Sequence, residues 1–232
     1  MRRLRLWPAY AILTVLAVLP AAGCAFDYSR ASEDFQTSVA KAPATIEVHN
    51  AIGAIVIDAW DKPNVQIDAQ KRAGTPEDAH AIAISVESNG SALVITSHFP
   101  ANSTNCKVDY VIHAPAGSNI DLEQSIGAIK SDGFTANVHE STSTGAIAAK
   151  MGTLGSGQDV KLHAGVGAIA LQIPATSSAA FSASTSVGAI GSNFPLTITR
   201  NVVGSSATGS IGRGDAKVDL TIATGAIAIQ RE

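Results

Sequence analysis

Three stretches of the chain repeat one pattern: NIDLEQSIGAIK at residues 119–130, VHESTSTGAIAA at 138–149 and VKLHAGVGAIAL at 160–171. The tripeptide Gly-Ala-Ile recurs along the chain, and Gly-Ser-Ile takes its place once. These repeats begin at seven glycines: Gly53, Gly127, Gly145, Gly167, Gly188, Gly209 and Gly225. From Gly127 onward the spacings are 18, 22, 21, 21 and 16 residues. A period near 20 residues indicates a fold made by stacking similar units.

The residues before each glycine alternate between apolar and polar. In the copy at Gly127, Ile120 and Leu122 are apolar, whereas Asp121 and Glu123 are polar. A period of two predicts a strand that is buried on one face. The residues one before and two after the glycine are also apolar in most copies, and both are predicted to point inward. Because a simple pleat cannot do this, a bulge or corner is expected at the glycine.

These patterns predict an all-β fold. We expect a β-solenoid, a single-stranded β-helix-like repeat of about 20 residues with Gly-Ala-Ile corners, in which each turn stacks on the last. A sandwich of successive hairpins remains the alternative, since strand signals come about every ten residues.

Residues 45–115 are predicted to form an N-terminal β region that is continuous with the repetitive region, residues 116–232. Alternating runs occur at 65–69, 82–86, 93–95 and 108–112. Asn89-Gly90 is a strong turn signal between two of them.

The first 23 residues are predicted to be a lipoprotein signal peptide. A short basic stretch precedes an apolar run at residues 6–19, and Ala-Ala-Gly then leads to Cys24, which resembles a bacterial lipobox. That resemblance implies a lipid on Cys24, and residues 24–44 are expected to be the lipidated cysteine and a tether. An ordinary signal peptide with an unrelated cysteine is the alternative. By analogy with the lipoprotein sorting rule of enteric bacteria, Ala25 rather than Asp after the cysteine favours the outer membrane if the organism has one, and otherwise the outer face of the cytoplasmic membrane.

Composition excludes several classes of protein. The chain has 232 residues, of which 46% are hydrophobic, 15% charged and 5% aromatic, with 20 glycines and two cysteines. This composition excludes a disulfide scaffold and a disordered chain. The formal charge is −3, and removing three arginines with the leader makes it −6, so nucleic acid is not an expected partner. Cys106 would then be the one remaining thiol, and a partly buried cysteine without a disulfide is expected.

No catalytic residues, metal site or cofactor are predicted. The acidic residues scatter over different positions of the repeat, and the nearest cluster, Asp121, Glu123 and Lys130, fits a solvated strand face. His139 and His163 lie two positions out of register, and no cysteine or acid completes a metal site with them.

Small residues follow each glycine, and they would form a smooth strip along the stack. The candidate binding strip consists of Ala128, Ala146, Ala168, Ala189, Ser210 and Ala226. Two explanations remain open. A tight corner can require small side chains, or the strip can dock an extended partner such as an envelope glycan or an envelope protein.

The pattern at 109–115 (DYVIHAP), then NIDL at 119–122, then the repeated strands with Gly-Ala-Ile, resembles the bacterial putative-adhesin domain of unknown function. That group is related to the head GIN domain of putative autotransporter adhesins. The resemblance covers about residues 45–232 and implies a secreted or lipid-anchored all-β repeat domain without known catalytic residues. The expected function is adhesion, scaffolding or partner binding by a non-enzymatic envelope lipoprotein. An envelope-stress sensory module and a carbohydrate-active β-helix enzyme are the alternatives, and the oligomeric state is left open.

Overall fold

A computed structural model describes residues 31–101 and 103–232, which form an all-β fold with a single short helix in the described part. The elements are β1 (Ala31–Val39), β2 (Thr45–Trp60), β3 (Val65–Ala73), α1 (Pro76–Ala81), β4 (Ala83–Ser88), β5 (Ala92–His98), β6 (Lys107–Pro115), β7 (Asn119–Phe134), β8 (Val138–Met151), β9 (Asp159–Ile173), β10 (Ala179–Ser192), β11 (Thr197–Arg200), β12 (Ser205–Ile211) and β13 (Ala216–Arg231).

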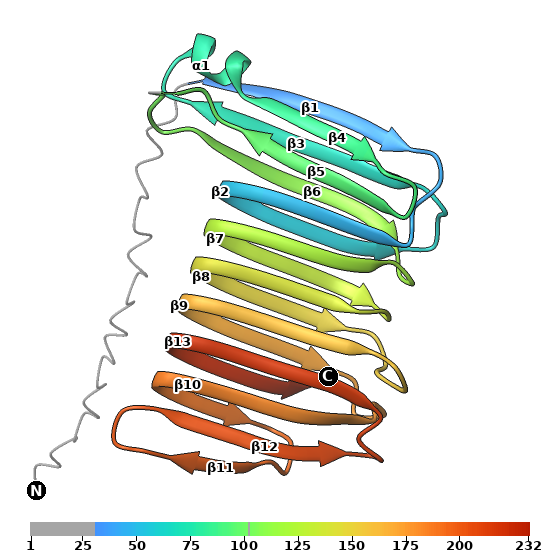
Figure 1. The fold of residues 1–232 in the computed structure, drawn as a ribbon, viewed down its shortest axis with the longest axis vertical. Coiled ribbons are helices and arrows are strands. Elements are labelled where there is room, and N and C mark those ends of the chain that lie inside the picture. The colour runs from blue at the N-terminus through green and yellow to red at the C-terminus, as the bar shows by residue number, and fades with distance from the viewer. Residues whose placement is uncertain (1–30, 102) are drawn as a thin grey trace, which may run out of the picture.

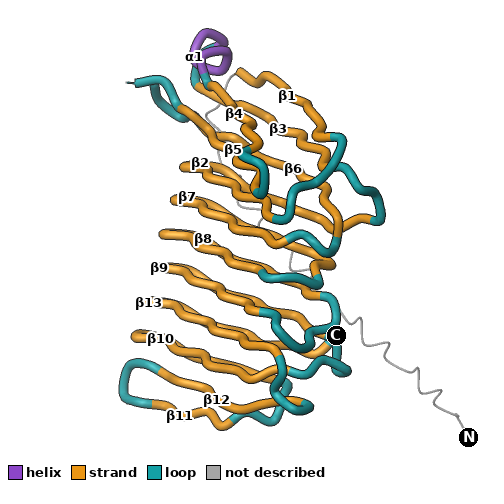
Figure 2. The backbone as a smooth tube through the Cα atoms, turned by 45° about the vertical axis from the view of Figure 1, so that its right-hand side comes forward, coloured by secondary structure: helices purple, strands orange, loops and turns teal. Residues whose placement is uncertain are grey.

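The thirteen described strands form one long open sheet (Figure 1). Its main path runs β1-β3-β6-β2-β7-β8-β9-β13-β10-β12-β11, and β4 joins through β5. Six long strands, β2, β7, β8, β9, β13 and β10, pair in parallel. Successive hairpins would instead pair antiparallel. Figure 2 shows that most loops gather on the side opposite to the bends of these long strands.

Each long strand bends at its glycine, and no other residue fits at this position. Gly127 and Gly167 have φ values of +137° and +144°, which L side chains rarely adopt. A Cβ on Gly167 would also lie 1.7 Å from the carbonyl oxygen of Gly145 in the neighbouring strand. The close approach of stacked backbones therefore explains why glycine recurs at this position.

Six of the seven repeat glycines are in register across the sheet, in the order Gly53, Gly127, Gly145, Gly167, Gly225 and Gly188. The expectation that each turn stacks on the previous one is wrong at β13, which lies between β9 and β10. Gly209 is not part of the row, because β12 pairs antiparallel with β10 and places Gly209 opposite Phe181.

The core lies between the two halves of the bent strands. Before the glycine, the buried residues are those three, five and seven positions away, such as Ile120 and Leu122. After it, the isoleucine two positions on is buried in all six long strands, and these residues are Ile55, Ile129, Ile147, Ile169, Ile227 and Ile190. Burying each isoleucine contributes about 1.5–3 kcal/mol.

The prediction that the residue one before the glycine points inward is wrong. Ile52, Ile126, Val166 and Val187 are among the exposed large hydrophobic residues. The reason is the width of the bend: the inward phase ends three residues before the glycine and resumes two residues after it. The four residues between these positions form the outside of the bend.

The N-terminal region contains the expected strands and one that the sequence analysis missed. Asn89-Gly90 forms the turn between β4 and β5, and the Asn89 side chain accepts a hydrogen bond from the Ala92 backbone N–H. The expectation that all of 24–44 is a tether is wrong for β1, which pairs antiparallel with β3 along its whole length. Its burial alternates between half-buried and exposed residues, so its hydrophobic signal is weak.

The remaining predictions for the N-terminus, the signal peptide and the lipid on Cys24, lie outside the described residues. Cys106 is predicted to be partly buried and without a disulfide; in the described structure it is buried and forms no disulfide. The part of the chain that the structure describes has no helix with the length and hydropathy needed to span a bilayer.

Candidate functional site: the glycine corner edge

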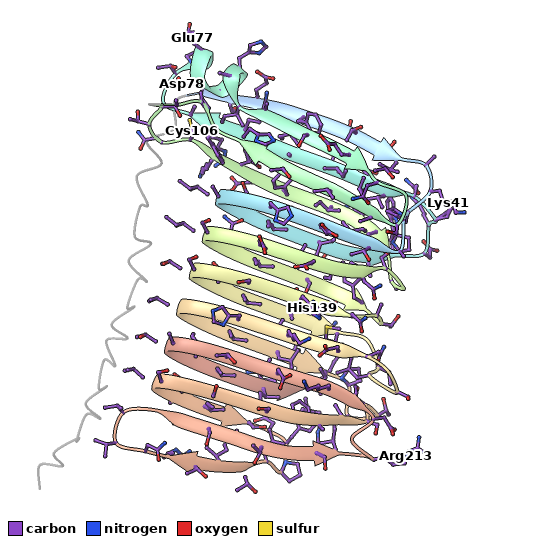
Figure 3. All side chains as sticks on the ribbon, in the orientation of Figure 1. Lys41, Glu77, Asp78, Cys106, His139 and Arg213 are labelled. Carbon is purple, nitrogen blue, oxygen red and sulfur yellow. The ribbon has the colours of Figure 1, made fainter. Side chains whose placement is uncertain are left out.

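The outside of the bend forms a continuous exposed surface, which we call the corner edge. It consists of four consecutive residues in each of six long strands, 24 residues in all: 51–54, 125–128, 143–146, 165–168, 223–226 and 186–189. None of these residues is charged, and none is buried. Charged residues such as Glu77 and Asp78 of α1, and Arg213 before β13, lie elsewhere in Figure 3. The corner edge is therefore an uncharged surface on an acidic protein.

Within the corner edge, the residue before each glycine forms a row that we call the ridge. In sheet order its members are Ile52, Ile126, Thr144, Val166, Thr224 and Val187. The four aliphatic members expose 42%, 53%, 51% and 48% of their surface, in that order. All six are β-branched, which suits a strand. A row of half-exposed aliphatic side chains costs free energy in water unless something covers it.

Beside the ridge lies a flat surface that we call the shelf, made of the six glycines and the alanine that follows each. Five residues of the predicted strip belong to it: Ala128, Ala146, Ala168, Ala226 and Ala189. Ala54 extends the row at the β2 end. Ser210 does not belong to it, because it lies on the antiparallel strand β12 opposite Ala180. The repeat pattern therefore predicts most of the shelf but not the exposure of the ridge.

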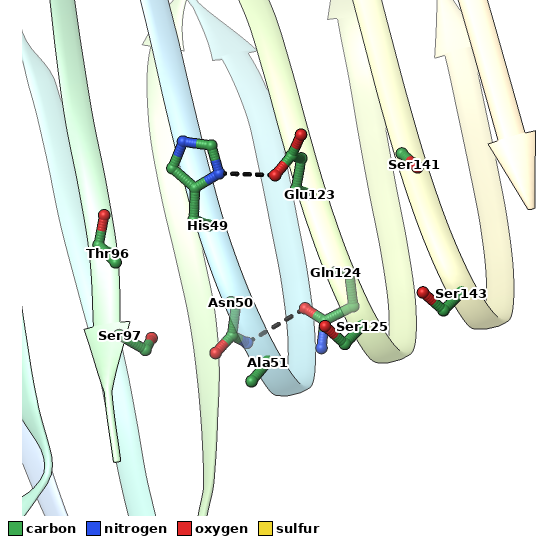
Figure 4. Close-up of a pocket in the computed structure, with 10 residues that line it drawn as sticks. All are labelled: His49, Asn50, Ala51, Thr96, Ser97, Glu123, Gln124, Ser125, Ser141 and Ser143. Atoms are coloured by element: carbon green, nitrogen blue, oxygen red, sulfur yellow. Dashed lines mark hydrogen bonds and ion pairs between the residues drawn. The ribbon is translucent and has the colours of Figure 1, made fainter.

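A polar groove adjoins the corner edge at its β2 end (Figure 4). It has a volume of about 440 Å³ and is lined by His49, Asn50, Ala51, Thr96, Ser97, Glu123, Gln124, Ser125, Ser141 and Ser143. The groove forms because β2 has two different neighbours on one side. Its first half pairs with β5, and its second half pairs with β6. The repeat pattern does not show this division, so sequence reasoning missed the groove.

Asn50 connects β2 to its neighbours β6 and β7 beside this groove. Its Nδ2 donates hydrogen bonds to the Val108 carbonyl oxygen at 2.8 Å and to Gln124 Oε1 at 3.1 Å. Its own Oδ1 is buried and has no hydrogen-bond partner in the described chain. Gln124 Nε2 in turn donates to the Ile126 carbonyl oxygen at 2.7 Å. The two amide side chains thus satisfy backbone carbonyls at the bend.

In the groove, His49 Nδ1 lies 2.9 Å from Oε2 of the Glu123 carboxyl group. In a catalytic arrangement the histidine would also contact a hydroxyl nucleophile. Thr96 and Ser141 line the same groove, but among the described residues neither makes a hydrogen bond with His49. The groove can bind polar groups, but it lacks the geometry of an activated nucleophile.

The other residues considered for chemistry stay apart. Asp121 and Glu123 precede the bend of β7 and Lys130 follows it, and no hydrogen bond joins Lys130 to them in the described structure. His139 pairs in register with Lys161, whereas His163 pairs with Ser141, so the two histidines are offset as expected. Within the described residues, no group of three potential metal ligands comes together.

One buried carboxyl group interrupts the core. Glu140 lies five residues before Gly145, between Leu122 and Leu162 of the neighbouring strands. Neither carboxyl oxygen has a hydrogen-bond partner among the described residues. Burial raises the pKa of Glu140 to about 7.

Among known proteins, this chain is similar in fold to a solved structure. The chain matches no family model and no curated protein. It is similar to the crystal structure of a putative cell adhesion protein from Clostridium sporogenes, with a TM-score of 0.60 and 14% identity over 87% of this chain and 100% of that chain. Putative adhesins from Bacteroides fragilis and Parabacteroides distasonis also match, at 11% and 10% identity. Their TM-scores are 0.27 and 0.25, and the matches cover 85% and 86% of this chain and 97% of each of theirs. At such identities, the first match shows a shared fold and nothing further.

Proposed function

We propose that this chain is a non-enzymatic lipoprotein of the cell envelope, anchored through a lipid on Cys24, whose β domain binds a partner through the corner edge. The observation that carries the proposal is the corner edge itself, 24 uncharged residues in register with an exposed aliphatic ridge. Large exposed apolar patches on soluble domains mark interaction surfaces.

The likeness of fold agrees with this proposal. The neighbour with the TM-score of 0.60 is described as a putative cell adhesion protein, which suggests a surface or envelope location for this chain as well. We interpret the bent parallel strands as turns of a β-solenoid whose corners are the six aligned glycines, an architecture suited to presenting one residue type in a straight row.

A non-enzymatic role is supported by the groove beside the corner edge. His49 is oriented by Glu123 but makes no hydrogen bond with a hydroxyl group in the described chain. In the described chain no hydrogen bond joins Lys130 to Asp121 or Glu123, and His139 and His163 are two positions out of register.

The anchor is supported by the sequence of residues 1–24 alone. Replacing the cysteine (Cys24→Ser) in the full chain should abolish incorporation of a radiolabelled fatty acid. The protein should then move from the membrane fraction to the soluble fraction. Retention of the label in this variant would contradict the anchor.

Binding through the corner edge is tested with envelopes prepared from cells that produce the chain. The purified full chain in detergent should cosediment with them, and the triple variant Ala146→Arg, Ala168→Arg, Ala189→Arg should not. The matched control changes alanines three residues after the glycines, outside the corner edge: Ala148→Arg, Ala170→Arg, Ala228→Arg. It should bind like the parent. Equal binding by all three proteins, with circular dichroism showing intact folds, would contradict the proposal.

A further inference from the structure

The corner edge is complementary to itself. Its ridge projects along one side and its shelf lies flat along the other, and both repeat once per strand across the same six strands. Neighbouring strands are about 4.8 Å apart. A second corner edge therefore presents the same repeat distance, and the two surfaces can pack without a mismatch accumulating along the stack.

One symmetry operation brings the ridge onto the shelf. A two-fold axis parallel to the direction of stacking exchanges the two sides of the corner edge and keeps each strand at its own level. The aliphatic side chain of Val166 would then lie over the Gly167–Ala168 surface of the second copy. A two-fold axis perpendicular to the stack would instead place ridge against ridge. Closed two-fold dimers are the commonest protein assemblies.

Size and charge favour a second copy as the occupant. Stable interfaces use roughly 20–30 residues on each side, and the corner edge supplies 24. Two copies of an acidic chain repel each other through charged faces, but the corner edge has no charge to bring together. Four of the six ridge side chains are aliphatic, so the ridge offers few hydrogen-bonding groups to a polar polymer.

The position of the N-terminus agrees with this orientation. Register pairs run across the sheet from Glu33 of β1 through Lys71 and Val108 to Gly53. The beginning of β1 therefore lies on the same side of the sheet as the bends of the long strands. Cys24 precedes Ala31 by seven residues, which span at most about 25 Å. An axis parallel to the stack leaves both N-termini at the same end, where two lipid anchors can enter one membrane.

We propose that the corner edge joins two copies of this chain in a parallel two-fold dimer, with the ridge of each copy packed on the shelf of the other. This inference rests on the proposed function, because it names the partner of the same surface.

The first test is the oligomeric state of the full chain, purified in detergent, by sedimentation equilibrium. The parent should dimerise, and the variant Ile52→Thr, Ile126→Thr, Val166→Thr, Val187→Thr should dimerise at least tenfold more weakly. Threonine already occupies the ridge at Thr144 and Thr224, so the fold tolerates it. Val111→Thr is the matched control, because Val111 exposes 42% of its surface on β6, away from the corner edge. A monomeric parent, or equal dimerisation by the ridge variant, would overturn the proposal.

The second test fixes the orientation. Ala54→Cys and Ala189→Cys lie in the two outermost strands of the corner edge, and each is made in a Cys106→Ser background. Because the shelf of one copy faces the ridge of the other in the parallel dimer, a mixture of Ala54→Cys with Ile52→Cys, made in the same background, should form disulfide-linked dimers. A mixture of Ala54→Cys with Ala189→Cys should form few. Crosslinks formed only between positions 54 and 189 would show an antiparallel dimer and overturn the proposal. If the chain binds envelopes but purified copies do not associate, the inference fails and the proposed function stands.

Discussion

Gly225 of β13 pairs with Gly167 of β9, although Gly188 is the next corner glycine along the chain after Gly167. The C-terminal strand therefore lies between β9 and β10 and makes the corner edge continuous. The corner edge is complete only when the last strand of the chain is in place. Such contacts between distant parts of the chain predict slow folding.

The glycines at the bends are expected to be irreplaceable. Gly167→Ala would place a Cβ 1.7 Å from the Gly145 carbonyl oxygen and strain a positive φ, so we expect a loss of more than about 3 kcal/mol of unfolding free energy. The control is Gly191→Ala, three residues after a corner glycine, where an added Cβ meets nothing within 4 Å. Its neighbour in register is Ala228, so this change should be neutral or stabilise by up to about 1 kcal/mol. Chemical denaturation measures both, and similar losses in the two variants would contradict the predicted crowding at the bends.

The buried carboxyl group of Glu140 should make stability depend on pH. Its pKa is about 7 in the folded protein, against an ordinary value of 4.5. Below pH 4.5 both folded and unfolded states hold the proton, and the stabilisation is complete. Between pH 4.5 and pH 7 the unfolded state releases its proton while the folded state keeps it, so the free energy of unfolding falls by about 3 kcal/mol over this range and levels off above pH 7.

Two variants isolate this effect from that of other carboxyl groups. Glu140→Gln keeps the size and removes the titration, so the difference between parent and variant should follow the predicted pH dependence. Glu140→Leu matches the neighbouring Leu122 and Leu162 and should be more stable than the parent at pH 8 by about 3 kcal/mol. Denaturation between pH 4 and pH 8 measures both differences. A parent that tracks the glutamine variant at every pH would show that Glu140 is not buried as described.

The stability of the region where β2 pairs with both β5 and β6 should depend on Asn50. Asn50→Leu removes the donor to the Val108 carbonyl oxygen and to Gln124, and we expect a loss of about 1–3 kcal/mol. The control is Gln36→Leu, which removes an exposed hydrogen bond to Asp68 and should change stability by less than about 0.5 kcal/mol. Thermal or urea denaturation compares the two, and equal effects would argue against a structural role for Asn50.

The sequence alone predicts most of the strands, but not β1 and not the order of the strands in the sheet. The alternation around Leu122 and Ile129 identifies buried and exposed faces, because strand periodicity is a local property. It does not distinguish a neighbour at Gly188 from one at Gly225, because every copy has the same phase and small side chains at the bend. The Gly209 copy shows the limit, since the same tripeptide pattern occurs in an antiparallel strand.

Only part of the candidate site could be predicted from the sequence, because a local repeat does not show how the strands bend and pair. The alanines after the glycines are visible as a repeat, and five of the six predicted strip residues lie on the shelf. Ile126 and Val166 are apolar, and apolar residues in strands usually point inward. Their exposure follows from the width of the bend, a geometric fact that residue types do not reveal. The groove at Asn50 depends on the pairing of β5 and β6 with one strand, which is also absent from the local pattern.

The order of strands at the corner edge is the central claim, and disulfide trapping tests it most directly. The double variant Val166→Cys, Thr224→Cys, made in the Cys106→Ser background, places two thiols in register on adjacent strands. Oxidation should join them rapidly within one chain. The pair Val166→Cys, Val187→Cys is separated by a whole strand, about 10 Å, and should not join. Crosslinking of the second pair but not the first would show that the turns stack in chain order and would contradict the account.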